Sequence, residues 1–485
     1  MAKVRLRDMV VVLPGIVGSV LEKDGKDVWA LSGQAAWGAL RGLGGSLKAL
    51  KLDGDDPQVD DLGDGVRASR LIPDFHIVPG LCKVDGYSGL RRLFQQRFEI
   101  VPGDPESPKP ANYFEFPYDW RRDNRVAARK LQRLVESALP RWRDYSGARD
   151  ARVILLAHSM GGLVSRHYLE VLGGWQECRA LVTFGTPHRG SLNALDFLAN
   201  GYKKAFLDLT EMMRSLTSVY QLLPIYQAVG SIQGYQRIAE GPALPHVDRE
   251  RATAALAFHR QIEAAVEENR QDSRFSRHGY EMVPIIGIRQ RTKQSAWLDG
   301  DLLRPSFDPP PVVEESLADG DGTVPRISAV PIELTGRFRD TYFAQQHSAL
   351  QNTPKVLDQL FERLKLSQNP QAGAVRGGGI SDRPSSPPAL GLEVDDLYLA
   401  DEPVVVRGQL FDVTDPGRLG ALVARLEPLT SGGSSQQLPL EPGADGWQVT
   451  VGGLAAGTYR VTLSASGAPY GGPSPVDALF EVAGA

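Results

Sequence analysis

The sequence predicts an α/β fold, with a mostly parallel sheet covered by helices on both faces, followed by a separate all-β sandwich. Two observations predict the α/β part: short β-branched runs recur at 10–13, 153–156, 180–183 and 283–288, and helical patterns lie between several of them. Near-continuous apolar strands that alternate with helices are typical of parallel sheets. A third observation predicts the sandwich: beyond residue 388, short alternating strands are separated by Gly and Pro turns.

The first strand is expected at 9–13. Basic residues precede it, as in a secretory signal, but Asp8 interrupts the junction and Pro14 ends the apolar run. No stretch of about 18 apolar residues occurs, so the sequence predicts no membrane-spanning helix. We therefore expect a cytoplasmic protein whose contact with membranes is peripheral.

Helices are expected between the strands. Residues 125–139 predict a crossover helix, because their apolar side chains fall near one face. Residues 29–50 also have apolar side chains at roughly helical spacing, and 191–280 form a long, mostly helical insertion. That insertion is either a cap over an apolar substrate or a helical subdomain packed on the core.

The C-terminal part is set off by a Gly-, Pro- and Ser-rich segment at 368–388. The expected division is an α/β domain at 1–365 with a cap at about 191–280, a flexible linker at 366–388, and a sandwich at 389–485. The segment 454–459 resembles the tyrosine corner of immunoglobulin-like folds. Six strands are expected in the sandwich, at 392–394, 404–410, 421–426, 447–451, 459–463 and 478–482.

The composition is that of a globular protein, with 42% hydrophobic and 23% charged residues, and a net charge of −4 gives no nucleic-acid signature. The sandwich region carries a net charge of −8 and the remainder +4, which would tolerate an anionic lipid surface. Cys82 and Cys178 form no disulfide framework, so a reducing compartment is the simplest interpretation, with one bridge left open.

Residues 152–162 carry the most informative pattern. A β-rich run ends at Ser159 between small residues, and a helix is expected at 163–169. This is the pattern of the nucleophile elbow of α/β-hydrolases, with Ala157 where glycine is usual. The alternative is an ordinary strand–turn–helix with an inert serine.

A serine nucleophile needs a histidine base oriented by a carboxylate, and these partners come after the serine in the order acid, then histidine. His347 is the last histidine and comes after the predicted strand 340–343, so it is the expected base. The acid is expected in the glycine-rich loop 319–325, at Asp319 or Asp321. The alternative for this loop is a solvated or calcium-binding turn, although it lacks the remaining ligands of an EF-hand.

The oxyanion of an acyl intermediate needs two N–H donors. One is expected from Met160, directly after the serine, and the other from Ile16 in the glycine-containing loop 13–19. The alternative for that loop is a plain strand-end turn.

The chain resembles the lecithin:cholesterol acyltransferase family, which includes group XV phospholipase A2 and bacterial lipases. The resemblance runs in family order over about residues 9–350, and 186–191 is shared more widely with lipases. Pro117-Tyr118-Asp119-Trp120-Arg121 is the most discriminating segment. The five matching segments are 14–18, 117–121, 157–162, 319–324 and His347.

The resemblance implies Ser159 as nucleophile, Asp321 rather than Asp319 as acid, His347 as base, and Ile16 and Met160 as oxyanion donors. It also implies a fatty-acyl ester substrate and a mobile lid. For Asp119 and Trp120 we expect a structural role near the site. Three features depart from the family: Ala157, the absence of an evident signal peptide, and the C-terminal sandwich.

These observations predict a serine hydrolase that cleaves fatty-acyl esters, of the lipase or phospholipase type, through an acyl-enzyme and with no metal or organic cofactor. One alternative is an O-acyltransferase that uses a lipid acyl donor. An alternative of another class is an inactive lipid-binding or adaptor protein, with the sandwich as its working part. The expected partners are a lipid or acyl-ester substrate, a membrane surface and a protein bound by the sandwich, but no nucleic acid.

Overall fold

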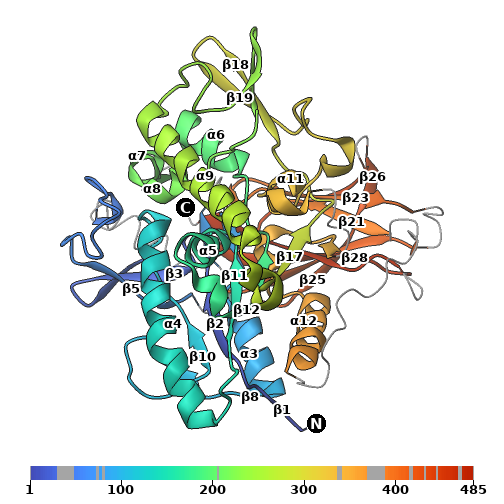
Figure 1. Ribbon diagram of the computed structural model, residues 1–485. Coiled ribbons are helices and arrows are strands. Elements are labelled where there is room, and N and C mark those ends of the chain that lie inside the picture. The colour runs from blue at the N-terminus through green and yellow to red at the C-terminus, as the bar shows by residue number, and fades with distance from the viewer. Residues whose placement is uncertain are drawn as a thin grey trace.

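The computed structural model describes residues 2–29, 49–72, 76–78, 82–204, 207–335, 341–368, 388–413, 419–430, 433–443, 446–467 and 472–483. Its centre is a parallel sheet of seven strands in the order β20-β17-β12-β11-β2-β10-β9 (Figure 1). The predicted α/β fold class is therefore confirmed. The strands are β2 Met9–Leu13, β9 Pro102–Gly103, β10 Tyr113–Glu115, β11 Val153–His158, β12 Cys178–Phe184, β17 Glu281–Gly287 and β20 Tyr342–Phe343.

The central strands are buried along their whole length, as their continuous apolar runs require. Two packed helix pairs flank the sheet: α4 with α5, and α3 with α12. The bounds are α3 Ser88–Arg97, α4 Asn124–Ser146, α5 Gly161–Arg166 and α12 Pro354–Ser367, with a π-helical turn at His167–Val171 and a 3₁₀ turn at Gly174–Gln176.

The crossover helix α4 is longer than the predicted 125–139. It continues through Pro140 to Ser146, although a proline removes one helical hydrogen bond. The last turns are held by Trp142, which is buried and donates from Nε1 to the Arg7 carbonyl at 2.7 Å. Tertiary contacts therefore override the helix-breaking signal.

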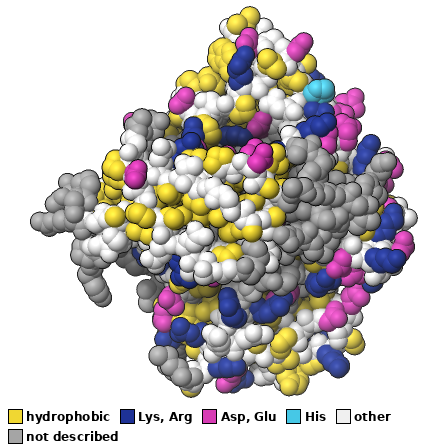
Figure 2. All heavy atoms as spheres, turned by 180° about the vertical axis from the view of Figure 1, so that it is seen from behind, with side chains coloured by type: hydrophobic (Ala, Val, Ile, Leu, Met, Phe, Trp, Pro, Cys, Tyr) yellow, Lys and Arg dark blue, Asp and Glu magenta, His cyan; other side chains and the backbone are white. Residues whose placement is uncertain are grey.

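The insertion between β12 and β17 contains helices and unpredicted short strands. β15 and β16 join β18 and β19 in a four-stranded sheet at the top of the molecule (Figure 1), where hydrophobic and charged side chains mix on the surface (Figure 2). The elements of the insertion are α6 Leu192–Asn200, β13 Lys203–Lys204, β14 Leu207–Asp208, α7 Thr210–Ser215, α8 Thr217–Tyr220, β15 Val229–Ser231, β16 Gly234–Gln236, α9 Arg249–Gln271 and α10 Ser273–His278. The other two strands of the sheet, β18 Ser295–Asp299 and β19 Leu302–Ser306, follow β17 in the chain.

Smaller elements surround the sheet. The predicted helical segment 29–50 lies almost wholly outside the described residues, and its last two residues, 49 and 50, are helical. The small sheets contain β1 Val4–Arg5, β3 Ser19–Lys23, β4 Lys26–Trp29, β5 Val66–Leu71, β6 His76–Val78, β7 Cys82–Val84 and β8 Phe98–Glu99, and the short helices are Glu315–Leu317, α11 Arg326–Ala329, Ile332–Leu334 and His347–Ala349.

The C-terminal region is a β-sandwich of two sheets, in the orders β21-β23-β27-β26 and β22-β29-β28-β24-β25, with its own apolar core. All six predicted strands are present, and β22, β25 and β26 were not predicted. The Tyr459 hydroxyl donates to the Ala455 carbonyl at 2.7 Å, as in a tyrosine corner. The strands are β21 Ala389–Glu393, β22 Leu397–Leu399, β23 Val404–Phe411, β24 Leu422–Pro428, β25 Gln436–Pro439, β26 Glu441–Gly443, β27 Gly446–Val451, β28 Gly457–Ala465 and β29 Val476–Ala483.

Most of the predicted linker 366–388 lies outside the described residues, so the division into domains stays a prediction. Among the residues that are described, no helix is long and apolar enough to cross a membrane.

Candidate active site

Ser159 lies in a sharp turn between β11 and α5. Its φ is +52°, a left-handed conformation that residues other than glycine rarely adopt. The turn is held by the Ser159 N–H, which donates to the Phe184 carbonyl at 2.9 Å, and by Thr186 Oγ1, which donates to the Ser159 carbonyl at 2.9 Å. This strained geometry is that of a nucleophile elbow, which presents the hydroxyl to a site.

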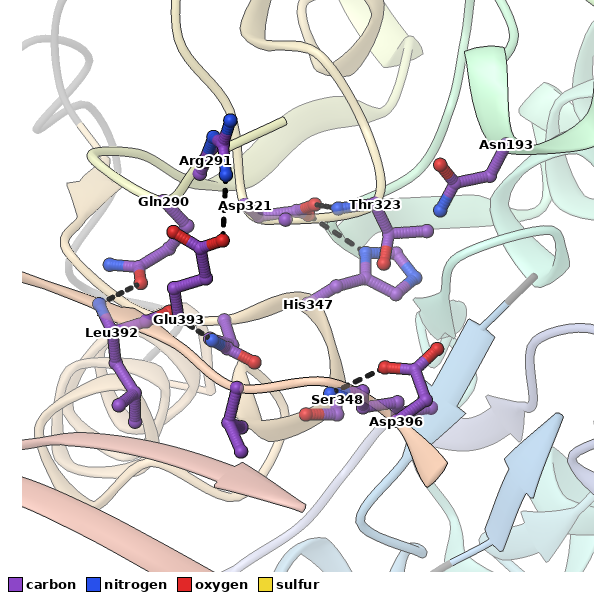
Figure 3. Close-up of a pocket in the computed structure, with 14 residues that line it drawn as sticks. Asn193, Gln290, Arg291, Asp321, Thr323, His347, Ser348, Leu392, Glu393 and Asp396 are labelled. Atoms are coloured by element: carbon purple, nitrogen blue, oxygen red, sulfur yellow. Dashed lines mark hydrogen bonds and ion pairs between the residues drawn. The ribbon is translucent and has the colours of Figure 1, made fainter. Parts of the chain in front are cut away.

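The structure brings three predicted residues into one hydrogen-bonded chain. Ser159 Oγ lies 3.0 Å from His347 Nε2, and His347 Nδ1 lies 2.7 Å from Asp321 Oδ2. All three side chains are buried, and Figure 3 shows the imidazole of His347 directed at Asp321. The arrangement can transfer a proton from the hydroxyl to the imidazole while the carboxylate orients the ring.

Two acidic candidates are separated by their contacts. Asp321 Oδ1 accepts hydrogen bonds from the N–H groups of Thr323, at 3.0 Å, and Val324, at 2.7 Å, so its other oxygen faces the imidazole. Asp319 instead accepts from the Arg289 N–H at 3.2 Å, and its pKa is raised by burial. The geometry therefore places Asp321, and not Asp319, beside the histidine.

The acid and histidine are crowded by the loop after β12. Gly185 has a φ of +59°, and a Cβ there would lie 2.7 Å from His347 Nδ1 and 2.8 Å from Asp321 Oδ2. Only glycine fits this close approach. Ser191 in the same loop donates from Oγ to the Thr323 carbonyl at 2.6 Å, so the segment 186–191 connects the serine turn to the acidic loop.

The predicted oxyanion loop lies directly against the nucleophile. A Cβ at Gly15 would stand 2.8 Å from the Cβ of Ser159, so the backbone can approach only because this residue is glycine. Ile16 is the next residue in this loop, and Met160 comes directly after Ser159 at the start of α5; both are buried. Their roles as N–H donors stay predictions.

The segment 117–121 forms the support of that loop. The Tyr118 hydroxyl donates to the Pro14 carbonyl at 2.8 Å, and Trp120 Nε1 donates to the Ser19 carbonyl at 3.0 Å. Asp119 is paired with Arg121 at 2.7 Å and makes no contact with the triad. These contacts are consistent with the structural role near the site that we expect for Asp119 and Trp120, and that role stays a prediction.

Tyr87 and His158 complete the site. No sequence pattern marked Tyr87, and His158 lies within the matching segment 157–162 without an assigned role. The Gly15 N–H donates to the Tyr87 hydroxyl at 2.8 Å, the hydroxyl lies 3.1 Å from His158 Nδ1, and His158 Nε2 lies 3.2 Å from the His347 carbonyl. Burial, with the nearby His347, lowers the pKa of His158 to about 3, so its ring is neutral. The three bonds are satisfied together when Tyr87 donates to Nδ1 and Nε2 donates to the carbonyl.

A buried thiol lies at the start of β12. Cys178 is a free cysteine, and burial raises the pKa of its thiol. Within the described ranges, no group of three or more His, Cys, Asp or Glu side chains is arranged to hold a metal ion.

No curated protein sequence matches the chain, whereas several solved structures are similar to it. The crystal structure of a Tle4–Tli4 complex is similar at 18% identity and a TM-score of 0.45, over 76% of this chain and 99% of that one. The Bacillus licheniformis lipase BlEst2 in its mature form is similar at 14% identity and a TM-score of 0.30, over 74% and 91%. The family model of lecithin:cholesterol acyltransferase matches residues 109–249, which include 117–121, Ser159 and 186–191, and so confirms the family resemblance seen in the sequence.

Proposed function

We propose that the protein is a serine hydrolase of fatty-acyl esters, with Ser159 as nucleophile, His347 as base and Asp321 as the acid that orients it. The observation that carries this proposal is the chain of two hydrogen bonds, 3.0 and 2.7 Å long, that begins at a serine with a φ of +52°. The match to the lecithin:cholesterol acyltransferase family supports a lipid ester as the substrate.

In the proposed mechanism His347 Nε2 accepts the hydroxyl proton as Ser159 Oγ attacks the ester carbonyl. The N–H groups of Ile16 and Met160 stabilise the oxyanion of the tetrahedral intermediate. Its collapse releases the alcohol, which takes the proton from His347, and leaves an acyl group on Ser159. Water then attacks the acyl-enzyme with His347 again as base, which releases the fatty acid.

Acyl transfer is the second candidate, and the family match favours it equally. The acyl-enzyme is the same, and the outcome depends on whether water or an acceptor alcohol attacks it. Product analysis with and without a long-chain alcohol separates the two. A third proposal, an inactive lipid-binding protein, requires that the assembled triad does no chemistry.

The proposed function is tested with Ser159→Ala. Loss of a complete triad lowers kcat by about 10⁶-fold in a well-studied serine protease, so hydrolysis of p-nitrophenyl esters and phospholipid vesicles should fall to background. Ser276→Ala on the exposed face of α10 is the matched control. A fluorophosphonate probe should label the control protein at Ser159. Unchanged turnover by Ser159→Ala, or no labelling of the folded control, would reject the proposal.

We further propose that the top sheet contacts the lipid surface. Ile232 comes directly after β15 and Leu302 begins β19, and the register between β15 and β18 places both at the same end of the sheet. Their exposed fractions are 98% and 58%, and an exposed apolar tip is typical of an interaction site.

The double substitution Ile232→Ser/Leu302→Ser should reduce binding and turnover of phospholipid vesicles severalfold, because less apolar surface enters the lipid. It should leave turnover of a soluble ester unchanged. Leu366→Ser, an exposed leucine on α12 at the other end of the molecule, is the control (Figure 1). Equal vesicle binding by the wild-type protein, the double variant and Leu366→Ser would contradict the proposed contact with the lipid surface.

A further inference from the structure

The loop that carries His347 is bonded to the C-terminal sandwich. The two residues before the histidine are glutamines, and each makes one such bond. Gln346 Nε2 donates to the Leu392 carbonyl at 2.7 Å, and Gln345 Oε1 accepts from the Asp477 N–H at 3.1 Å. The sandwich therefore holds the histidine loop from both β21 and the start of β29.

The loop that carries Asp321 is linked to β21 through Gln290. Gln290 is buried, and its amide is paired at both ends with the backbone of β21: Oε1 accepts from the Leu392 N–H, and Nε2 donates to the Leu390 carbonyl, each at 3.0 Å. The Gln290 N–H donates to the Gly320 carbonyl at 3.0 Å, next to Asp321. One side chain thus joins the acidic loop to the sandwich (Figure 3).

The catalytic sheet itself supports these loops weakly. β20, which leads to His347, is an edge strand of two residues with two register pairs to β17. Such a short edge strand restrains the next loop only weakly, whereas a proton-transfer chain requires positions held within about 0.5 Å. The hydrogen bonds from β21 supply restraint at the point where the sheet ends.

The contact is built as a fixed interface. Leu397 and Ala483 of the sandwich are buried in the same apolar core as the central sheet. The charges are complementary, since cations of the α/β part face carboxylates of the sandwich in four ion pairs of 2.6–2.8 Å: Lys83–Asp396, Lys204–Glu402, Arg289–Asp412 and Arg291–Glu393. A polar cavity of about 100 Å³ remains between the sandwich and His347 (Figure 3).

We propose that the C-terminal sandwich is a positioning element of the active site, which acts through Gln290, Gln345 and Gln346 on the loops of Asp321 and His347. The inference rests on the proposed function, because it assigns the two loops a role in catalysis. The sandwich then raises turnover of every substrate, including soluble esters. A sandwich that only binds a surface or a partner would leave soluble-ester turnover independent of these contacts.

The test uses full-length variants that keep side-chain volume but remove the hydrogen bonds, Gln290→Met and Gln346→Met. A displacement of about 1 Å in a catalytic group costs on the order of 10²-fold, so kcat for a p-nitrophenyl ester should fall about 10- to 100-fold with KM within twofold. The rate of fluorophosphonate labelling should fall in parallel. Gln346→Lys keeps a donor that can reach the Leu392 carbonyl and should recover most of the loss.

Two controls give the test its specificity. Gln437→Met replaces an exposed glutamine of β25, and Lys204→Met removes an interface contact that touches neither catalytic loop. Both should retain kcat. Thermal unfolding of each variant shows that the comparison is made between folded proteins.

The outcomes separate this inference from the proposed function. If the wild-type protein is labelled at Ser159 but Gln290→Met and Gln346→Met keep kcat within twofold, the positioning role is overturned and the hydrolase stands. An equal loss in Lys204→Met also overturns it, because the effect would then come from general weakening of the interface. Failure of the folded wild-type protein to react with the probe overturns both.

Discussion

The Tyr87 hydroxyl holds the predicted oxyanion loop. That group accepts from the Gly15 N–H at 2.8 Å and lies 3.1 Å from His158, which in turn contacts the backbone of His347. A displacement of Tyr87 therefore reaches both the oxyanion loop and the histidine loop. We therefore expect Tyr87 to act as a positioning residue, through Gly15 and His158.

Tyr87→Phe should lower kcat about tenfold and leave KM nearly unchanged. The substitution leaves a buried N–H and a ring nitrogen unpaired, which costs about 1–3 kcal/mol in unfolding free energy. Steady-state kinetics on a soluble ester and urea unfolding measure the two effects. Tyr145→Phe, at a residue that is 65% exposed, should change neither. A kcat for Tyr87→Phe equal to that of the control would remove Tyr87 from the site.

The sequence reveals the proposed reacting residues better than the residues that would position them. Ser159 and His347 are recognisable because their chemistry imposes a local pattern and a chain order. Tyr87 lies 72 residues from Gly15 in the chain, and no local pattern marks such a pair. Gln290 and Gln346 bond to backbone groups of β21, which any sequence in that strand would present. These contacts are visible only in the folded chain.

At the scale of elements, the loop 14–19 depends on the segment 117–121 after β10. The Tyr118 hydroxyl bonds to the carbonyl of Pro14, and the Tyr118 N–H donates to Ser19 Oγ at 3.1 Å, so one residue holds both ends of the loop. The loop contains the predicted oxyanion donor Ile16, and its position sets the direction of that N–H.

Tyr118→Phe should therefore reduce transition-state stabilisation more than substrate binding. Removal of an oxyanion donor costs about 10²–10³-fold in kcat, and a donor that is only displaced should cost less, on the order of tenfold. Measurement of kcat and KM on a soluble ester, with Tyr145→Phe again as the control, tests this. An increase in KM alone would show that Tyr118 serves substrate binding instead.

The predicted elements differ from the observed ones in a regular way. Long buried strands such as β11 and β12 were placed to within two residues, because burial demands a continuous apolar run. β15 and β26 have three residues each and were missed, since so short a strand shows no period. Helix α4 continues beyond Pro140 because Trp142, in its last turns, is buried. Sequence periodicity therefore identifies the long elements that build the core. Very short strands, which depend on pairing with a neighbouring strand, can be seen only in the folded structure.

At the scale of the whole molecule, the two parts carry complementary net charges. The sandwich region has a net charge of −8 and the remainder +4. Four ion pairs join cations of the α/β part to carboxylates of the sandwich. One further pair has the opposite polarity, since Arg460 of the sandwich pairs with Asp85 of the α/β part at 2.5 Å. The net charges were evident in the sequence, but their use in a contact between the two parts required the folded arrangement.

The whole molecule should lose stability as the pH falls, because three buried histidines and the half-buried His188 are held in their neutral form. Burial is the main cause that lowers the pKa of His158 to about 3, of His167 and His259 to about 4, and of His188 well below its usual value. The unfolded chain binds protons below about pH 6.5 whereas the folded one does not, so unfolding free energy decreases from pH 6.5 towards pH 4. His158, His167 and His259 each contribute about 2 kcal/mol to that loss at pH 5, since one pKa unit is worth about 1.4 kcal/mol. Urea unfolding at pH 7.5 and 5.0 measures the difference in unfolding free energy.

The substitution His167→Phe should reduce this difference by about 2 kcal/mol. The phenyl ring should keep the stacking on Phe258, whose ring centroid lies 5.5 Å from that of His167. Nδ1 of His167 has no hydrogen-bond partner, so the phenyl ring loses no bond there. A variant with the same acid sensitivity as the wild-type protein would show that His167 is protonated in the folded state.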